Sequence, residues 1–170
     1  EYNKSIHSPK FNGEKFIYFS ASYQPEALTN INAGFYSDHF QVLDILSNVI
    51  PNDWLIYYKE HPATFSTLPG FRGSLVKSKQ YYDRLKSYGN IRLMSTNTKT
   101  TKLIDASKFV ATIGGTVGWE SILRGTPTLS FGSSWYHDCK SVFVIKSIDD
   151  AKKAVNKVID GYIPDQEDIL

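Results

Sequence analysis

The segment Ile-Gly-Gly-Thr-Val-Gly-Trp-Glu at residues 113–120 contains the small residues that a phosphate-binding turn needs. Gly114 and Gly115 allow the backbone to approach a bound anion closely, because glycine has no side chain. Glu120 follows Thr116 by four residues, where its carboxylate could accept hydrogen bonds from a ribose or could only stabilise the positive end of a helix dipole. The segment matches neither the dinucleotide fingerprint nor a Walker A loop, so it supports neither NAD binding nor ATP hydrolysis. A plain strand-to-helix turn with Thr116 as N-cap is the structural alternative.

A second segment, Lys-Glu-His-Pro at residues 59–62, places a cation, an anion and an imidazole within three residues. Pro62 favours an extended backbone at His61, which would hold the ring at the edge of a sheet. There His61 could donate a hydrogen bond to a phosphate, and Lys59 could neutralise the phosphate charge. A single histidine is more often a surface residue or a core residue with its hydrogen bonds satisfied, so this interpretation depends on the neighbouring segments.

A third segment, Ser-Ala-Ser-Tyr-Gln-Pro-Glu at residues 20–26, combines an aromatic ring, an amide and a carboxylate. Tyr23 could stack on a base or a sugar, and Glu26 could bind hydroxyl groups. Gln24 adds a side chain that both donates and accepts hydrogen bonds. A turn built around Pro25 explains the same residues almost as well.

The run that begins at Ser133 and ends at Cys139 invites a metal-binding or catalytic-cysteine interpretation. Neighbouring side chains of an extended segment point in opposite directions, so His137, Asp138 and Cys139 make a poor chelate. We therefore expect no metal here and expect the run to line a ligand cleft.

Short apolar runs alternate with segments of helical periodicity and would position these loops. The runs predict six strands, at residues 16–20, 54–59, 91–94, 109–113, 127–131 and 142–145. Helical spacing predicts helices at residues 38–49, 79–88, 102–106, 117–123 and 147–159, and residues 63–78 are predicted to form a long loop. This alternation predicts an α/β fold, a doubly wound parallel sheet of the Rossmann type. The carboxyl ends of parallel strands share one edge, so the three polar loops should meet there.

Composition is that of one folded domain. The chain has 170 residues, of which 41% are hydrophobic and 21% charged. A net charge of +2 is too small to argue for nucleic acid or an anionic membrane surface. A single cysteine excludes an internal disulfide, and no apolar run approaches the roughly 18 residues that span a bilayer, so we expect a cytoplasmic protein. The chain begins at Glu1 without a methionine, so we expect it to be part of a longer protein.

The order of the polar segments along the chain is also informative. Residues 23–26, 59–62 and 114–121, followed by Arg-Gly-Thr-Pro at 124–127 and Phe-Gly at 131–132, together resemble the capsular polysaccharide biosynthesis family over roughly residues 16 to 160. That family includes Kdo transferases that use a CMP-activated sugar, and the His-Pro pair is similar to that of bacterial sialyltransferases. No single motif is specific, but their ordered combination is.

The resemblance implies one half of a GT-B glycosyltransferase, the C-terminal domain that holds the donor nucleotide, with no cofactor and no essential metal. Residues 1–161 would form this domain and residues 162–170 a tail or linker, while the N-terminal acceptor domain would be missing from this chain. By this resemblance His61 and Glu26 would be catalytic. Donor-binding roles would fall to Tyr23, Gln24, Lys59, Gly114, Gly115, Thr116, Glu120 and Ser133.

The expected partners follow from the same resemblance. They are a nucleotide-sugar donor, a glycan or glycolipid acceptor that binds through the missing domain, and membrane-bound assembly machinery at the inner face of the cytoplasmic membrane, with no nucleic acid. In GT-B enzymes the base that deprotonates the acceptor often lies in the N-terminal domain, so we expect this chain alone to bind donor and turn over little. Two alternatives stay open: a UDP-sugar 2-epimerase, and a non-catalytic assembly module on a Rossmann scaffold.

Overall fold

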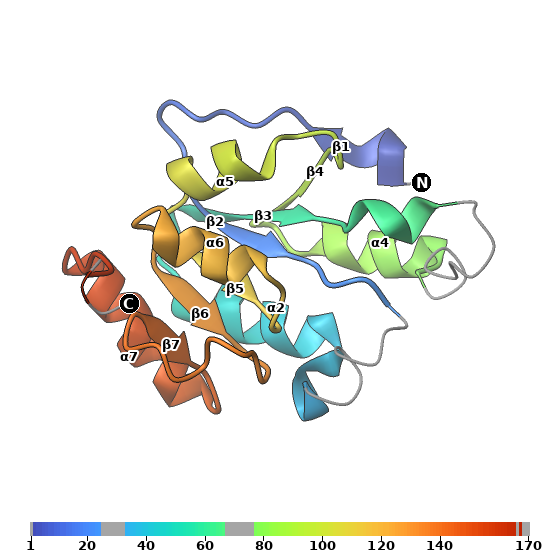
Figure 1. The fold of residues 1–170 in the computed structure, drawn as a ribbon. Coiled ribbons are helices and arrows are strands. Elements are labelled where there is room, and N and C mark those ends of the chain that lie inside the picture. Colours follow the sequence, from blue (N-terminus) through green and yellow to red (C-terminus); the bar gives the residue numbers. More distant parts are fainter. Residues whose placement is uncertain (1, 25–32, 67–76, 166, 168–170) are drawn as a thin grey trace.

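Parallel strands form one sheet in the order β1-β4-β3-β2-β5-β6-β7 (Figure 1). The computed structural model describes residues 2–24, 33–66, 77–165 and 167. Within these residues the strands are β1 (Ile6–His7), β2 (Lys15–Ser20), β3 (Trp54–Lys59), β4 (Ile91–Met94), β5 (Val110–Thr112), β6 (Thr128–Ser130) and β7 (Val142–Val144). Six of them confirm predicted strands. The two-residue β1 was not predicted, because so short a segment shows no periodicity.

Helices connect most of the neighbouring parallel strands, as is usual for such crossovers, whereas β6 and β7 are joined by residues 131–141 without a helix. The helices are α2 (His39–Val49), α4 (Lys79–Ser87), α5 (Thr100–Ala106), α6 (Val117–Leu123) and α7 (Ile148–Ile159), with short 3-10 turns η1 (Tyr2–Ser5), η2 (Gly34–Ser37) and η3 (Pro62–Phe65). The side chain of Asp38 accepts a hydrogen bond from the backbone N–H of Phe40 at 2.9 Å, which caps α2 as predicted. Part of the predicted loop at residues 63–78 forms η3, and residues 67–76 lie outside the described residues.

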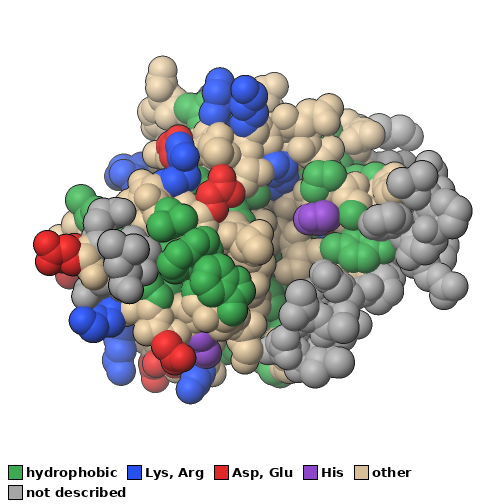
Figure 2. All heavy atoms as spheres, viewed as in Figure 1, with side chains coloured by type: hydrophobic (Ala, Val, Ile, Leu, Met, Phe, Trp, Pro, Cys, Tyr) green, Lys and Arg blue, Asp and Glu red, His purple; other side chains and the backbone are tan. Residues whose placement is uncertain are grey.

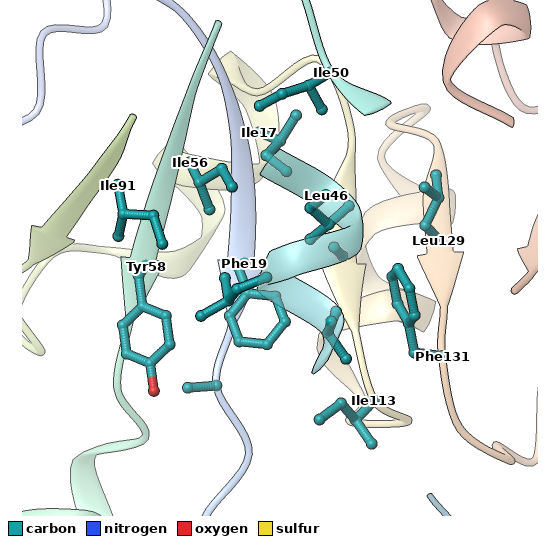
Figure 3. Packing of buried hydrophobic residues seen from close by; sticks show 14 of the residues in the cluster. Ile17, Phe19, Leu46, Ile50, Ile56, Tyr58, Ile91, Ile113, Leu129 and Phe131 are labelled. Atoms are coloured by element: carbon teal, nitrogen blue, oxygen red, sulfur yellow. The ribbon is translucent and has the colours of Figure 1, made fainter. Parts of the chain in front are cut away.

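The sheet is covered on both faces, which confirms the doubly wound α/β fold. Side chains alternate along each strand, so Ile17 and Phe19 pack with Leu46 of α2 in the larger core (Figure 3). That core also contains apolar residues of α4 and α7. Tyr18 and Tyr57 point to the other face, where they pack with residues of α5 and α6.

The order of the strands creates a crevice at the centre of the sheet. β2 pairs with β3 on one side and with β5 on the other, because the chain builds β3 and β4 outward before it crosses back to β5. Loops that leave the carboxyl ends of β2 and β5 therefore diverge to opposite faces. In open α/β sheets such a switch point is where ligands bind.

The segment that follows α7 lies against the sheet. The ring of Tyr162 packs on Phe143 of β7 with centroids 4.9 Å apart, and Pro164 is buried. The domain boundary placed at residue 161 stays a prediction. None of the helices that the structure describes has the length and apolar character needed to span a membrane.

Candidate functional site

A cavity of about 950 Å³ opens at the crevice between the carboxyl ends of β2 and β5. Figure 2 shows the molecular surface from the same side as Figure 1. Eight of the predicted site residues line the cavity: Tyr23, Lys59, His61, Gly114, Gly115, Thr116, Glu120 and Ser133. They come from the end of β3 and from the segments that follow β2, β3, β5 and β6, including the first turn of α6. The structure thus brings His61 and Thr116 to one cavity, which the prediction of a shared site required.

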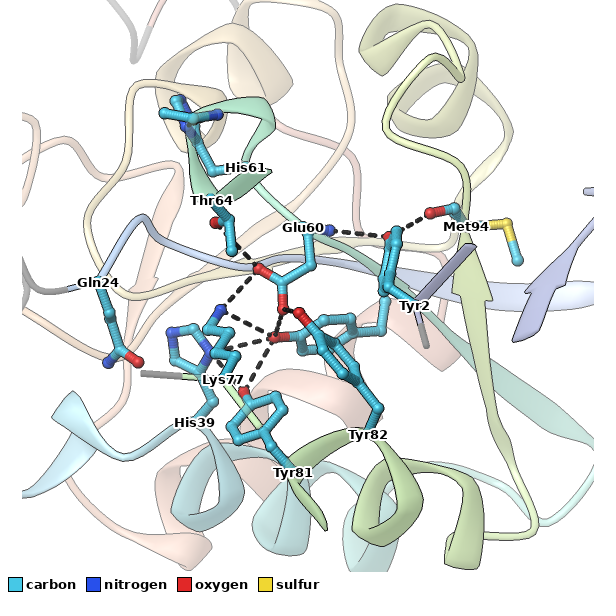
Figure 4. Close-up of polar contacts among 12 residues, drawn as sticks. Tyr2, Gln24, His39, Glu60, His61, Thr64, Lys77, Tyr81, Tyr82 and Met94 are labelled. Carbon is cyan, nitrogen blue, oxygen red and sulfur yellow. Dashed lines mark hydrogen bonds and ion pairs between the residues drawn. The ribbon is translucent and has the colours of Figure 1, made fainter. Parts of the chain in front are cut away.

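His61 is held in place by its own side chain. It occupies the N-cap of η3 with an extended backbone, as the following Pro62 predicted, and its Nδ1 accepts a hydrogen bond from the N–H of Ala63 at 3.1 Å. Since Nδ1 is the acceptor, the proton of the neutral ring lies on Nε2. The ring lies at the exposed end of the turn, 6.2 Å from the ring of Tyr23, and points away from the buried Glu60 in Figure 4. Nε2 is therefore the atom that can donate to a ligand.

Lys59 is buried at the floor of the cavity. Its Nζ donates to the carbonyl oxygen of Thr98 at 2.7 Å and to the hydroxyl of Thr100 at 2.9 Å. An ammonium has three donors, so one N–H remains for a ligand. Burial lowers the pKa of Lys59, and the negative charge of Glu120 partly opposes this. Lys59 thus ties the loop after β4 to the cavity as well as supplying positive charge.

Glu60 is used differently from its neighbours in the sequence. Because successive residues of a strand point to opposite faces, Glu60 enters the α4 side of the sheet while Lys59 faces α5. Its carboxylate pairs with the ammonium of Lys77 at 2.6 Å, and both side chains are 0% exposed. Tyr58 donates to the same carboxylate at 2.9 Å, and Thr64 and Tyr82 donate at 3.4 Å (Figure 4).

This polar cluster extends to His39 at the start of α2. Its Nδ1 lies 3.2 Å from the hydroxyl of Tyr58 and 3.1 Å from that of Tyr81. Burial lowers the pKa of His39 well below its usual value, and the nearby charge of Lys77 lowers it further. The cluster was not predicted from the sequence, because the partners of Glu60 lie far apart along the chain and Lys77 lies in a segment without periodicity.

The glycine turn after β5 is packed against the loop after β6. Gly114 has a φ of 138°, and a Cβ there would lie 2.9 Å from the carbonyl oxygen of Ser133. The hydroxyl of Tyr136 donates to the carbonyl oxygen of Gly115 at 2.6 Å. The hydroxyl of Thr112 accepts hydrogen bonds from the N–H groups of Gly114 and Gly115 at 3.3 and 3.1 Å. The two glycines therefore shape the turn, and their amides already have a partner.

Thr116 and Glu120 are the polar side chains that this turn offers to a ligand. Thr116 stands at the N-cap position of α6, but its side chain makes no capping hydrogen bond, contrary to the purely structural interpretation of the turn. Its hydroxyl is exposed at the cavity. Glu120 lies in the first turn of α6 and is half-buried in the cavity wall.

Two predicted residues are not brought to the cavity by the described structure. The side-chain amide of Gln24 donates to the carbonyl oxygen of Ser37 at 2.5 Å, and Gln24 does not line the cavity. Glu26 lies outside the described residues. Tyr18, Thr100 and Trp135 do line the cavity and had not been singled out individually.

Comparison with solved structures identifies proteins that share this fold. The solved structures that resemble it include a beta Kdo 2,7 transferase, KpsC of Thermosulfurimonas dismutans (TM-score 0.57, 15% identity, 91% of this chain and 48% of KpsC). They also include the S. aureus MnaA–UDP co-structure (0.58, 16%, 94% and 40%) and the Methanocaldococcus jannaschii UDP-GlcNAc 2-epimerase in complex with UDP-GlcNAc and UDP (0.56, 15%, 95% and 41%). At these identities the likeness shows the fold.

Sequence comparison identifies the family. Protein FixF of Sinorhizobium fredii is 24% identical over 155 residues, which are 89% of this chain and 34% of FixF. The chain therefore spans about a third of that relative and less than half of the three solved structures. The profile of the capsule polysaccharide biosynthesis proteins matches residues 7–139, most of the chain. The chain belongs to the capsule polysaccharide biosynthesis protein family.

Proposed function

We propose that this chain binds a nucleotide-activated sugar and forms the donor-binding part of a glycosyltransferase that makes capsule or other surface polysaccharide. The observation that carries the proposal is the cavity at the switch point of the sheet, in which Lys59 and His61 from the end of β3 meet the carboxylate of Glu120 from the start of α6. Its volume of about 950 Å³ lies at the upper end of the range of about 300–1,000 Å³ for small-molecule sites. Membership of the family and the fold shared with KpsC support the proposal.

The chemistry follows from the charge that develops during transfer. When the bond between the sugar and the phosphate breaks, negative charge grows on the leaving nucleotide. Nε2–H of His61, the remaining N–H of Lys59 and the hydroxyl of Thr116 would stabilise that charge as fixed donors. The side chains of His61 and Lys59 are positioned before the ligand arrives, because His61 caps η3 and Lys59 is already bound to Thr98.

The other predicted residues would bind the rest of the donor. Glu120 would accept hydrogen bonds from ribose hydroxyls, and Tyr23 and Ser133 would face the sugar. Transfer would need no cofactor or metal, and Glu26 would serve hydroxyls from the loop after β2. A second domain would bind the glycan or glycolipid acceptor and would carry the base that deprotonates it. The isolated chain would therefore bind the donor with little or no turnover. The reaction would take place in the cytoplasm, at membrane-bound assembly machinery.

An epimerase is the second candidate, and one observation favours it. A UDP-GlcNAc 2-epimerase from M. jannaschii shares the fold over 95% of this chain. The two activities differ in whether an acceptor is needed. A full-length protein that contains this chain, incubated with UDP-GlcNAc alone, would form the 2-epimer if it were an epimerase. A non-catalytic module would bind no nucleotide at any concentration.

Binding can be tested directly on this chain by thermal shift and calorimetry with CMP, UDP, GDP and their sugars. A ligand at about 100 times its Kd adds about 2.7 kcal/mol of stability, or roughly 5–10 °C in Tm for a chain of this size. His61→Ala and Glu120→Ala should each weaken binding by about 10- to 100-fold, the worth of one hydrogen bond to a charged group. His7→Ala is the control, because His7 is exposed on β1, outside the cavity. Unchanged affinity in both site variants would remove these residues from the site.

A further inference from the structure

An indole ring forms part of the cavity wall and remains largely exposed. Trp135, in the loop after β6, lines the cavity and is 68% exposed. Its ring lies 4.7 Å from that of Trp119 on α6, and Leu123 of the same helix is also exposed. Hydrophobic side chains gather over α6 on this face of the molecule (Figure 2). Exposed apolar patches of this kind mark interaction sites.

The backbone that carries Trp135 is fixed on both sides. Tyr136 is buried, and its hydroxyl binds the glycine turn through Gly115. The ring of Tyr136 stands perpendicular to that of Trp135, with centroids 5.3 Å apart. On the other side, the carbonyl group of Ser133 packs against Gly114. The indole is therefore held at a set place relative to the turn that bears Thr116.

The surroundings of the indole decide which ligand fits. A pyranose ring has an apolar face of C–H groups and a polar rim of hydroxyls, so it requires a flat aromatic surface beside hydrogen-bonding groups. Trp135 offers the surface, and the exposed Ser133 in the same loop offers a hydroxyl. The proposed phosphate ligands His61 and Thr116 line the same cavity, so one molecule can contact both parts.

We propose that Trp135 is the platform on which the sugar ring of the donor stacks, and that it selects sugar-bearing nucleotides over free ones. This inference rests on the proposed function, since it assigns the sugar end of the ligand whose phosphate binds His61 and Thr116. Trp135 then contributes to the affinity for the nucleotide sugar and not to the affinity for the nucleotide. The ratio of the affinity for the nucleotide sugar to the affinity for the nucleotide therefore isolates the contribution of Trp135.

Calorimetry with two ligand pairs measures this preference. The pairs are UDP with UDP-GlcNAc, and CMP with CMP-N-acetylneuraminic acid. In Trp135→Ala the ratio of the nucleotide Kd to the nucleotide-sugar Kd should fall by about five- to tenfold, the worth of one aromatic stacking contact. In Trp135→Phe this ratio of dissociation constants should stay close to that of the unaltered chain, because phenylalanine also offers an aromatic face. Leu123→Ala is the matched control, because Leu123 is an exposed apolar residue on the same face that does not line the cavity.

Fluorescence gives a second readout that loss of stability alone would not produce. The emission of the exposed Trp135 should shift to shorter wavelength when a nucleotide sugar binds, and much less when the nucleotide alone binds. Trp54 is buried and should not respond. Trp135→Phe should abolish the shift while it keeps the affinity.

The outcomes separate the two proposals. If none of the four probes binds the unaltered chain, donor binding itself fails and the role of Trp135 fails with it. If nucleotides bind and Trp135→Ala weakens the nucleotide and the nucleotide sugar equally, the indole stacks on the base, and the sugar platform is refuted while donor binding stands. An unchanged ratio with full affinity for both ligands would show that the patch serves another partner, which also refutes the platform.

Discussion

Removing the charge of Glu60 should destabilise the chain far more than removing one charge of an exposed ion pair. Glu60→Gln keeps the shape of the side chain but leaves the ammonium of Lys77 buried without a counter-ion. The ammonium would then face a neutral amide in place of the carboxylate, and its other contacts with the described residues are the hydroxyl of Tyr58 at 3.4 Å and the rings of Tyr58 and Tyr81, whose centroids are 6.0 and 5.4 Å away. With Lys77 0% exposed, water cannot take the place of the carboxylate.

The size of the effect follows from this burial. Breaking a buried ion pair by removing one partner costs about 3–5 kcal/mol, a large part of the roughly 5–15 kcal/mol that stabilises a typical domain. With a urea m value of about 2 kcal/mol/M, the midpoint of unfolding should fall by about 2 M. Lys15 and Asp53 provide the control. Their charged atoms lie 2.8 Å apart, but the side chains are 56% and 61% exposed, so Lys15→Met should cost about 0–1 kcal/mol.

Urea unfolding followed by circular dichroism gives both values. The double variant with Glu60→Gln and Lys77→Met removes both charges, so it should be more stable than the sum of the single changes predicts, by about 2–3 kcal/mol. If Glu60→Gln shifted the midpoint no further than Lys15→Met does, Lys77 would have to reach water, and the description of a closed, charged cluster beneath the cavity would be wrong.

Three further predictions concern residues around the site. Burial lowers the pKa of His39 in the folded chain, so His39 stays neutral there, whereas in the unfolded chain it gains a proton near pH 6.5. The free energy of unfolding should therefore be highest above pH 6.5 and should fall by about 1.4 kcal/mol per pH unit below it. His39→Gln should remove this pH dependence, measured by urea unfolding at pH 5 to 7. Gly132→Ala should lower the free energy of unfolding by about 1–3 kcal/mol in the same assay, because the new Cβ would clash with the carbonyl oxygen of Ile113. Gly89→Ala is the control: its Cβ would meet no neighbour within 4 Å, so the free energy of unfolding should change by less than about 0.5 kcal/mol. Thr112→Val should weaken nucleotide binding in calorimetry, because it removes the acceptor of two amides of the glycine turn; full affinity would show that the turn keeps its shape without that hydroxyl.

Local patterns predicted most of the elements because their signals are local. The apolar stripe and the capping aspartate of α2 lie within one segment, and β3 is a continuous apolar run. β1 escaped prediction because its two residues are a strand only through pairing with Leu93 and Met94, far along the chain. Strand pairing between residues far apart along the chain gives no local sequence signal.

Part of the candidate site could be predicted from the sequence, because it follows from the fold class. Loops after parallel strands must meet at one edge, so the convergence of His61 and Thr116 followed from the fold class. The separation of Lys59 from Glu60 follows from strand alternation, but the partner that makes Glu60 a core residue comes from a segment without a pattern. The placement of the glycine turn also depends on a tertiary contact, the hydrogen bond that the distant Tyr136 hydroxyl donates to the carbonyl oxygen of Gly115.

The place of β2 in the sheet has a consequence for synthesis on the ribosome. Its first partner, β3, emerges soon after it, but the other edge of β2 stays open until Tyr18 can pair with Val110. During that interval an apolar strand exposes unpaired backbone groups, which makes the nascent chain prone to aggregation. The cavity also lacks one wall until the residues of β5 and α6 have emerged. A chain released before residue 110 should therefore form no complete cavity.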